Sequence, residues 1–112
     1  MQFLVILKTV LKAQETIAEI KRRLVEQFQP QAIILFGSHA WGQPREESDI
    51  DLLILKESDQ DKHRMGVEVQ KILHDIDCSL DLLVYKPSDL RNKQQGFFNK
   101  ILSEGTWLYG SA

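Results

Sequence analysis

Apolar and polar positions change their period several times along the chain, and each change predicts a different element. From about Phe3 to Phe28 the apolar residues recur at helical spacing while charged residues fill the other side, which predicts one long helix or two shorter ones. Pro30 ends this region, because the residue before a proline is driven away from helical geometry. The first part of the chain is therefore expected to be helical.

Short apolar runs follow, and their composition is typical of β-strands. Residues 32–36 (AIILF), 49–56 (DIDLLILK) and 79–85 (SLDLLVY) are rich in isoleucine, leucine and valine. The first run is apolar throughout, which predicts a strand buried on both faces. Residues 106–109 (TWLY) predict a short edge strand. The sheet is therefore expected to contain at least three strands.

Segments with helical signals separate these strands. Ser38 is expected to cap a short helix over residues 39–41. Asp59 or Asp61 is expected to cap a helix that runs through Asp75, with its apolar residues on or near one face.

Ser88 is expected to begin a last helical region that extends to about Leu102, with a break at Gly96. The order is thus helix, strand, short helix, strand, helix, strand, helix. We expect one small α/β (α+β) domain over residues 1–112, with helices that mostly cover one side of the sheet.

Composition excludes several classes of protein. The net charge of −2 and the pI of about 5.9 argue against a protein that binds nucleic acid directly by neutralising phosphates. Cys78 is a lone cysteine, so no intrachain disulfide or Cys/His zinc quartet is expected, and the cytoplasm is the expected compartment. Lys8 interrupts the first apolar run, so we expect neither a signal peptide nor a membrane span.

Aspartates interrupt two of the predicted strands. Asp49 and Asp51 point to the same face, because side chains alternate along a strand, and Asp81 begins the third strand. Each alone has a simpler reading: Asp49 as a loop cap, Asp51 on an exposed edge strand, and Asp81 on the surface. Together, three carboxylates on neighbouring strands would repel one another strongly, and magnesium ions, which prefer oxygen ligands, would remove that repulsion.

The turn at Gly37-Ser38 complements this cluster. Taken alone it is an ordinary turn, but glycine lets the backbone approach a ligand, and the N–H groups at a helix start attract phosphate oxygens. Two magnesium ions about 3.5–4 Å apart can stabilise the attacking and leaving oxygens of a phosphoryl or nucleotidyl transfer. The combination predicts a site for a nucleoside triphosphate.

At this point the sequence resembles a known family. Gly37-Ser38, ten further residues and then Asp49-Ile50-Asp51 resemble the GS-x10-DxD signature of the polymerase β-type nucleotidyltransferases. SDIDLLI at 48–54 and LDLLVY at 80–85 are similar to the two catalytic strands of that family. The likeness extends roughly over residues 33–109, and the size resembles that of the minimal nucleotidyltransferases, the MNT domains.

The resemblance implies a mixed sheet flanked by helices, ATP as the nucleotide donor and two Mg²⁺ ions. It implies that Asp49 and Asp51 bind the metals and the triphosphate, and that Asp81 is the third metal ligand and a candidate base. Gly37 and Ser38 would hold the phosphates.

Minimal nucleotidyltransferases of this size typically pair with a helical HEPN ribonuclease toxin. The resemblance therefore implies an antitoxin that transfers AMP from ATP to a tyrosine of that toxin, within a hetero-oligomer and away from membranes. Two alternatives stay open. One is a nucleotidyltransferase that acts on a small-molecule or RNA hydroxyl, and the other is an antitoxin that acts by docking alone.

Overall fold

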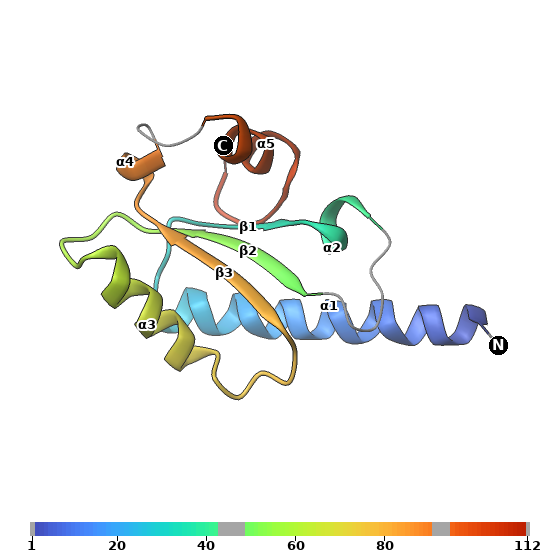
Figure 1. Cartoon of the computed structure of the whole chain (residues 1–112). Coiled ribbons are helices and arrows are strands. Elements are labelled where there is room, and N and C mark those ends of the chain that lie inside the picture. The colour runs from blue at the N-terminus through green and yellow to red at the C-terminus, as the bar shows by residue number, and fades with distance from the viewer. Residues whose placement is uncertain (1, 43–48, 91–94, 112) are drawn as a thin grey trace.

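The computed structural model describes residues 2–42, 49–90 and 95–111, which form helices on the two faces of one sheet (Figure 1). None of the helices among these residues is long and apolar enough to cross a membrane. The elements in chain order are α1 (Gln2–Gln27), β1 (Ala32–Phe36), α2 (Ser38–Trp41), β2 (Ile50–Leu55), α3 (Lys62–Ile72), β3 (Leu80–Tyr85), α4 (Pro87–Leu90), α5 (Gln95–Glu104) and β4 (Thr106–Tyr109).

The sheet has four strands in the order β3-β2-β1-β4. Strands β2 and β3 are parallel, whereas β1 is antiparallel to both β2 and β4. The parallel pair is possible because α3 lies between its two strands in the sequence and provides the crossover. The predicted mixed sheet is confirmed, and the TWLY segment forms an edge strand, as expected.

Helices cover both faces of the sheet, so the expectation that they mostly cover one side is wrong. One core joins α1 and α3 to one face, and a second joins α5 to the other. The cause is visible in β1, all five residues of which are buried, because a continuous apolar strand needs cover on both faces. The buried helical residues are Ile20, Leu24, Met65 and Val69 in the first core, and Phe98 and Ile101 in the second.

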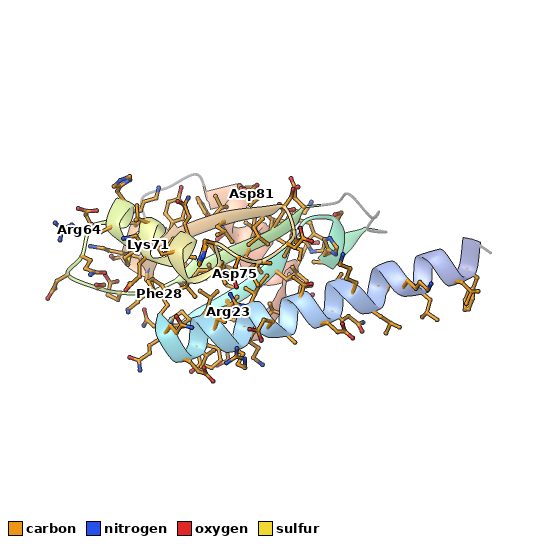
Figure 2. The ribbon with its side chains drawn as sticks, turned by 90° about the horizontal axis from the view of Figure 1, so that it is seen from below. Arg23, Phe28, Arg64, Lys71, Asp75 and Asp81 are labelled. Atoms are coloured by element: carbon orange, nitrogen blue, oxygen red, sulfur yellow. The ribbon has the colours of Figure 1, made fainter. Side chains whose placement is uncertain are left out.

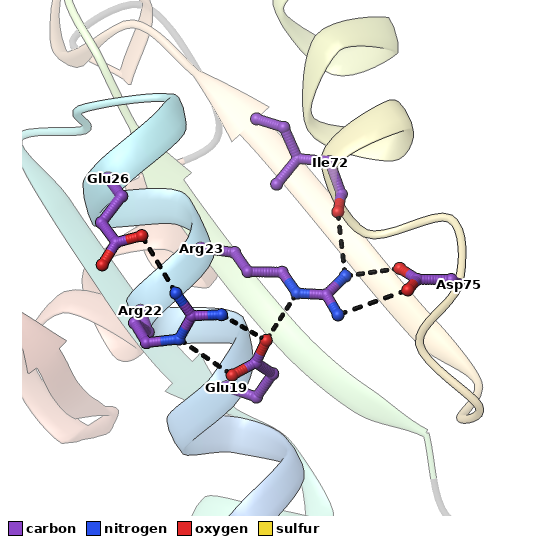
Figure 3. A network of polar contacts seen from close by, with 6 residues as sticks. All are labelled: Glu19, Arg22, Arg23, Glu26, Ile72 and Asp75. Carbon is purple, nitrogen blue, oxygen red and sulfur yellow. Dashed lines mark hydrogen bonds and ion pairs between the residues drawn. The ribbon is translucent and has the colours of Figure 1, made fainter.

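Helix α1 is a single element without a break, and a network of ion pairs joins it to the end of α3 (Figure 3). The Arg23 guanidinium donates to the Ile72 carbonyl oxygen at 3.2 Å and pairs with the Asp75 carboxylate. Glu19 accepts from Arg23 at 2.7 Å and pairs with Arg22, so the network continues along α1. We call the contacts of Arg23 with Ile72 and Asp75 the clamp. Figure 2 also shows Arg23 and Asp75 next to each other.

Two predicted helix boundaries differ from the structure. Asp61 caps α3 as expected and accepts from the Arg64 backbone N–H at 2.8 Å, but the helix ends at Ile72 and does not reach Asp75. Ser38 is the first residue of α2 rather than its cap, because the cap position is occupied by Gly37, which has no side chain to offer.

The last helical region is divided differently from the prediction. Pro87–Leu90 and Gln95–Glu104 form two helices, and the four residues between them lie outside the described part of the chain. Gly96 lies inside α5, so the expected break at this glycine is wrong.

Candidate active site

The parallel pairing of β2 with β3 places two of the predicted carboxylates side by side. Asp51 is the direct partner of Asp81 in the register of the two strands, which in a sheet lie about 4.8 Å apart. Further along the same strands, Leu53 and Leu83 pack in the core beneath α5, so alternation puts both aspartates on the α5 face. Asp49 lies two residues before Asp51, just ahead of β2, and is exposed.

The turn after β1 closes on the same carboxylate. Phe36, the last residue of β1, is the register partner of Asp51, so the following Gly37 reaches the Asp51 side chain. A Cβ atom at Gly37 would lie 2.0 Å from Asp51 Oδ2, and its φ of 76° falls in the left-handed region. Glycine is therefore required here both by space and by backbone conformation.

Ser38 follows as the first residue of α2 and is half-buried. The backbone N–H groups of Ala40 and Trp41 donate to the Gly37 carbonyl oxygen at 3.0 and 2.8 Å, which fixes the turn. The structure thus brings together Gly37 and the aspartates that the sequence singles out at separate places in the chain.

The electrostatic environment of Asp51 favours a bound cation. Burial raises the pKa of this carboxyl, and the nearby charges of Asp81 and Asp49 raise it further, while His39 opposes the shift. An aspartate with these neighbours is held in its ionised form only at a cost in free energy. A positive charge placed among the carboxylates would remove that cost.

The chemistry of these residues fits Mg²⁺, which takes carboxylate oxygens and keeps places for water and phosphate oxygens. Asp51 and Asp81 supply such oxygens from adjacent strands, and Asp49 precedes them on the same chain segment. Among the described residues, no three His, Cys, Asp or Glu side chains already form a group that could hold a metal ion. The fit therefore rests on the Asp51–Asp81 pair and on its unbalanced negative charge.

Two features of the site do not follow from the motif. His39, two residues after the turn glycine, is half-buried and by its charge lowers the pKa of the Asp51 carboxyl, which burial raises. Trp41 is held at the end of α2 by two contacts: its indole Nε1–H donates to the Glu104 carbonyl oxygen at 2.7 Å, and its ring centroid lies 6.4 Å from that of Phe36.

A cavity of about 390 Å³ lies beside β3 and includes Asp81 in its lining. Sequence reasoning missed it, because its lining comes from the end of α3, the following loop and β3, which share no motif. Cys78 is in this lining, and burial together with the charge of Asp49 raises the pKa of its thiol, as expected for a small hydrophobic residue rather than a nucleophile. The other lining residues are Gln70, Leu73, His74, Ile76, Leu80 and Leu82.

Two curated proteins are similar to this chain. A candidate protein adenylyltransferase of Methanocaldococcus jannaschii is 31% identical over 78 residues, which cover 70% of this chain and 76% of that protein. The protein adenylyltransferase MntA of Shewanella oneidensis is 30% identical over 81 residues, which cover 72% of this chain and 55% of MntA. The chain thus spans about half the length of MntA.

Solved structures share the fold. A candidate nucleotidyltransferase of Sulfolobus solfataricus has a TM-score of 0.69 at 16% identity and covers 95% of this chain and 87% of its own. A toxin–antitoxin structure with AMP-PNP has a TM-score of 0.63 at 26% identity, with 84% and 73% covered. A complex of the tri-AMPylated Shewanella oneidensis HEPN toxin with its MNT antitoxin has a TM-score of 0.59 at 24% identity, with 88% and 72% covered.

The comparison with protein families agrees with the paired aspartates and the glycine turn of the candidate site. Residues 18–112, which include all four strands and the three aspartates, match the family described as polymerase beta nucleotidyltransferase. This match spans most of the chain, and the chain therefore belongs to the polymerase beta nucleotidyltransferase family.

Proposed function

We propose that this chain transfers AMP from ATP to a tyrosine hydroxyl of a helical HEPN-type toxin protein and thereby acts as its antitoxin. The observation that carries the proposal is the register pairing of Asp51 with Asp81, closed on one side by a glycine turn that admits no side chain. Support for AMP as the transferred group comes from MntA, which is named a protein adenylyltransferase, and from the structure of an AMPylated HEPN toxin with an MNT antitoxin.

Each residue of the proposed site has a definite role in the transfer. Backbone N–H groups at the Gly37-Ser38 turn and the Ser38 hydroxyl hold phosphate oxygens, which orients the triphosphate. Asp81 accepts the proton of the tyrosine hydroxyl, and the phenolic oxygen attacks the α-phosphorus of ATP. The bond between the α-phosphorus and the bridging oxygen breaks, and pyrophosphate leaves with that oxygen. The products are AMP-tyrosine and pyrophosphate.

The aspartates also serve to hold metal. Asp49, Asp51 and Asp81 would bind two Mg²⁺ ions, which supply positive charge to the phosphate oxygens as negative charge develops on them. The raised pKa of Asp51 supports this role, since its carboxylate lies among like charges and gains from a bound cation.

The test uses a HEPN-type protein sought among the genes beside the one that encodes this chain. Its intact mass is measured after incubation with the chain, ATP and MgCl₂. We expect its mass to increase by one or more AMP units, located at tyrosine by peptide mapping. Asp51→Asn should lower the rate at least about 100-fold, because it removes one of the carboxylates that would hold the Mg²⁺ ions. Asp77→Asn is the matched control, since Asp77 is an exposed aspartate outside the site.

The same proteins separate chemistry from docking. If Asp49→Ala with Asp51→Ala neutralises the toxin as well as the unaltered chain does, docking alone accounts for the antitoxin effect and the proposal fails. If the unaltered chain binds ATP but leaves the mass of the HEPN protein unchanged, the acceptor is wrong. A mass increase on RNA or on a small-molecule hydroxyl under the same conditions would then identify the acceptor class.

A further inference from the structure

The first third of α1 exposes a row of large apolar side chains that the fold does not use. Phe3, Leu4, Leu7 and Leu11, here called the α1 stripe, are 74%, 58%, 41% and 48% exposed. With 3.6 residues per turn these four positions lie within about 100° of the helix circumference, so they form one continuous face. A large apolar face that stays in water is unfavourable unless a partner covers it.

The α1 stripe points away from most of the residues that bury α1 in the core. Ile20 and Leu24, which bury α1 in the core, point roughly a third of a turn away from the stripe. On the stripe's own face the exposed residues beyond Leu11 are polar or small, namely Gln14, Ala18 and Arg22. Val25, five turns beyond Leu7, is half-buried against the first core. The large exposed apolar side chains of α1 are therefore confined to the part that projects past the sheet in both views (Figures 1 and 2).

This projecting part lies at the end of the sheet that carries the candidate active site. Strands β2 and β3 both begin at that end, with Asp51 and Asp81 in their first two residues. The charges near Cys78 agree with this placement of α1. Asp49 raises the pKa of the Cys78 thiol and Lys12 of α1 lowers it, so both residues lie near Cys78. The carboxylates lie on the α5 face and α1 covers the opposite face, so a protein bound to the α1 stripe would reach the carboxylates around this end of the sheet.

The charge around the α1 stripe indicates what kind of partner fits. Between Gln2 and Lys12 the chain has two lysines, Lys8 and Lys12, and no carboxylate. A second copy of the same helix would bring like charges together, whereas an apolar helix with acidic residues at its margins would complement both features. Two lysines and four apolar residues are also a small anchor for a membrane surface, which generally needs a larger apolar face or a second signal.

We propose that the α1 stripe docks the acceptor protein through an apolar helical surface with acidic margins and so delivers its tyrosine to the active site. This inference rests on the proposed function, because it concerns the protein that receives AMP. Docking and transfer are separable, since the stripe residues are not part of the metal or phosphate site.

The test compares the triple variant Leu4→Gln, Leu7→Gln, Leu11→Gln with the control Ala18→Gln, an exposed position on the same helix. The dissociation constant for the neighbouring HEPN protein is measured without nucleotide, and AMP transfer is measured separately. We expect the triple variant to raise the dissociation constant at least tenfold and to leave ATP binding and Tm unchanged. The control should leave the dissociation constant, ATP binding and Tm unchanged.

Each other outcome has one meaning. An unchanged dissociation constant overturns the docking surface, whether or not AMP is transferred. Weaker binding by the triple variant, with no transfer by the unaltered chain, keeps the docking surface and overturns the proposed function. A change only in the oligomeric state of the free chain assigns the stripe to a second copy, and a change only in flotation with anionic lipid vesicles assigns it to a membrane; both overturn the inference.

Discussion

At the scale of single residues, the site depends on one contact between a glycine and a carboxylate. The Asp51 oxygen occupies the space that a side chain at residue 37 would need, and the left-handed backbone there disfavours every residue with a Cβ. The motif that spaces Gly37 and Asp51 along the chain therefore describes a contact in space. Substitutions at either residue should disturb the other.

Gly37→Ala should lower the rate of AMP transfer at least about 100-fold, because its Cβ would displace the Asp51 carboxylate. We also expect the free energy of unfolding to fall by about 1–3 kcal/mol from backbone strain. Gly66→Ala is the matched control, since nothing lies within 4 Å of its Cβ position in α3. It should keep full activity and gain about 0.5–1 kcal/mol. Equal activities of the two variants would refute the contact.

Asp51→Asn should raise Tm at neutral pH in the absence of metal. The pKa of Asp51 is raised in the folded chain, so its ionisation costs stability; the cost is absent below the unfolded-state pKa and complete above the folded-state pKa. Mg²⁺ at a hundred times its dissociation constant should add about 2.7 kcal/mol to the unaltered chain. Melting curves of both proteins with and without MgCl₂ check this, and a metal-induced shift that survives in Asp51→Asn would contradict it.

Among the helices and strands, the ion pairs between α1 and the end of α3 fix the position of the helix that carries the α1 stripe. Arg23 reaches from α1 to the Ile72 carbonyl oxygen and the Asp75 carboxylate, and it lowers the pKa of Asp75. Arg22 and Arg23 together lower the pKa of Glu19 to about 2. Three charged residues on one helix are thus held in fixed positions at neutral pH.

Asp75→Asn should lower Tm by a few degrees at pH 7, since an exposed ion pair contributes little even in good geometry. A lowered carboxyl pKa adds stability above its unfolded-state value, and that stability is lost as the pH falls through the folded-state pKa. The difference from the unaltered chain should therefore shrink as the pH falls below the unfolded-state pKa of an aspartate. Thermal melts from pH 7 down to 2.5, with Asp77→Asn as control, measure it. A difference that is independent of pH would contradict an ionic clamp.

The sequence predicts the strands and the shared face of the aspartates well, because both are local patterns. The apolar runs locate β1, β2, β3 and β4, and the spacing of the aspartates gives their shared face. The cover on both faces of the sheet and the clamp at Arg23 join segments far apart in the chain, and the cavity beside Asp81 depends on how the end of α3 folds back on β3. No local pattern encodes such contacts. The cap of α2 and the C-terminal end of α3 depend on backbone angles that single residue types do not determine.

At the scale of the whole molecule, the candidate active site lies at one end of the sheet and the projecting part of α1 extends past that same end. This arrangement suits an acceptor that is itself a protein, because such an acceptor can contact the helix and the carboxylates together. Family membership establishes the nucleotidyltransferase fold and class, while the acceptor is the part that experiment must identify.

The proposed reaction transfers the AMP part of ATP, and not its terminal phosphate, to a tyrosine of the HEPN protein. The most direct measurement uses ATP labelled at either the α- or the γ-phosphate, incubated with the chain, the HEPN protein and MgCl₂. We predict that α-label becomes bound to the HEPN protein at tyrosine, that γ-label is released in pyrophosphate, and that Asp51→Asn abolishes both. Transfer of γ-label to the HEPN protein, or no transfer of either label while ATP binds, would contradict the account.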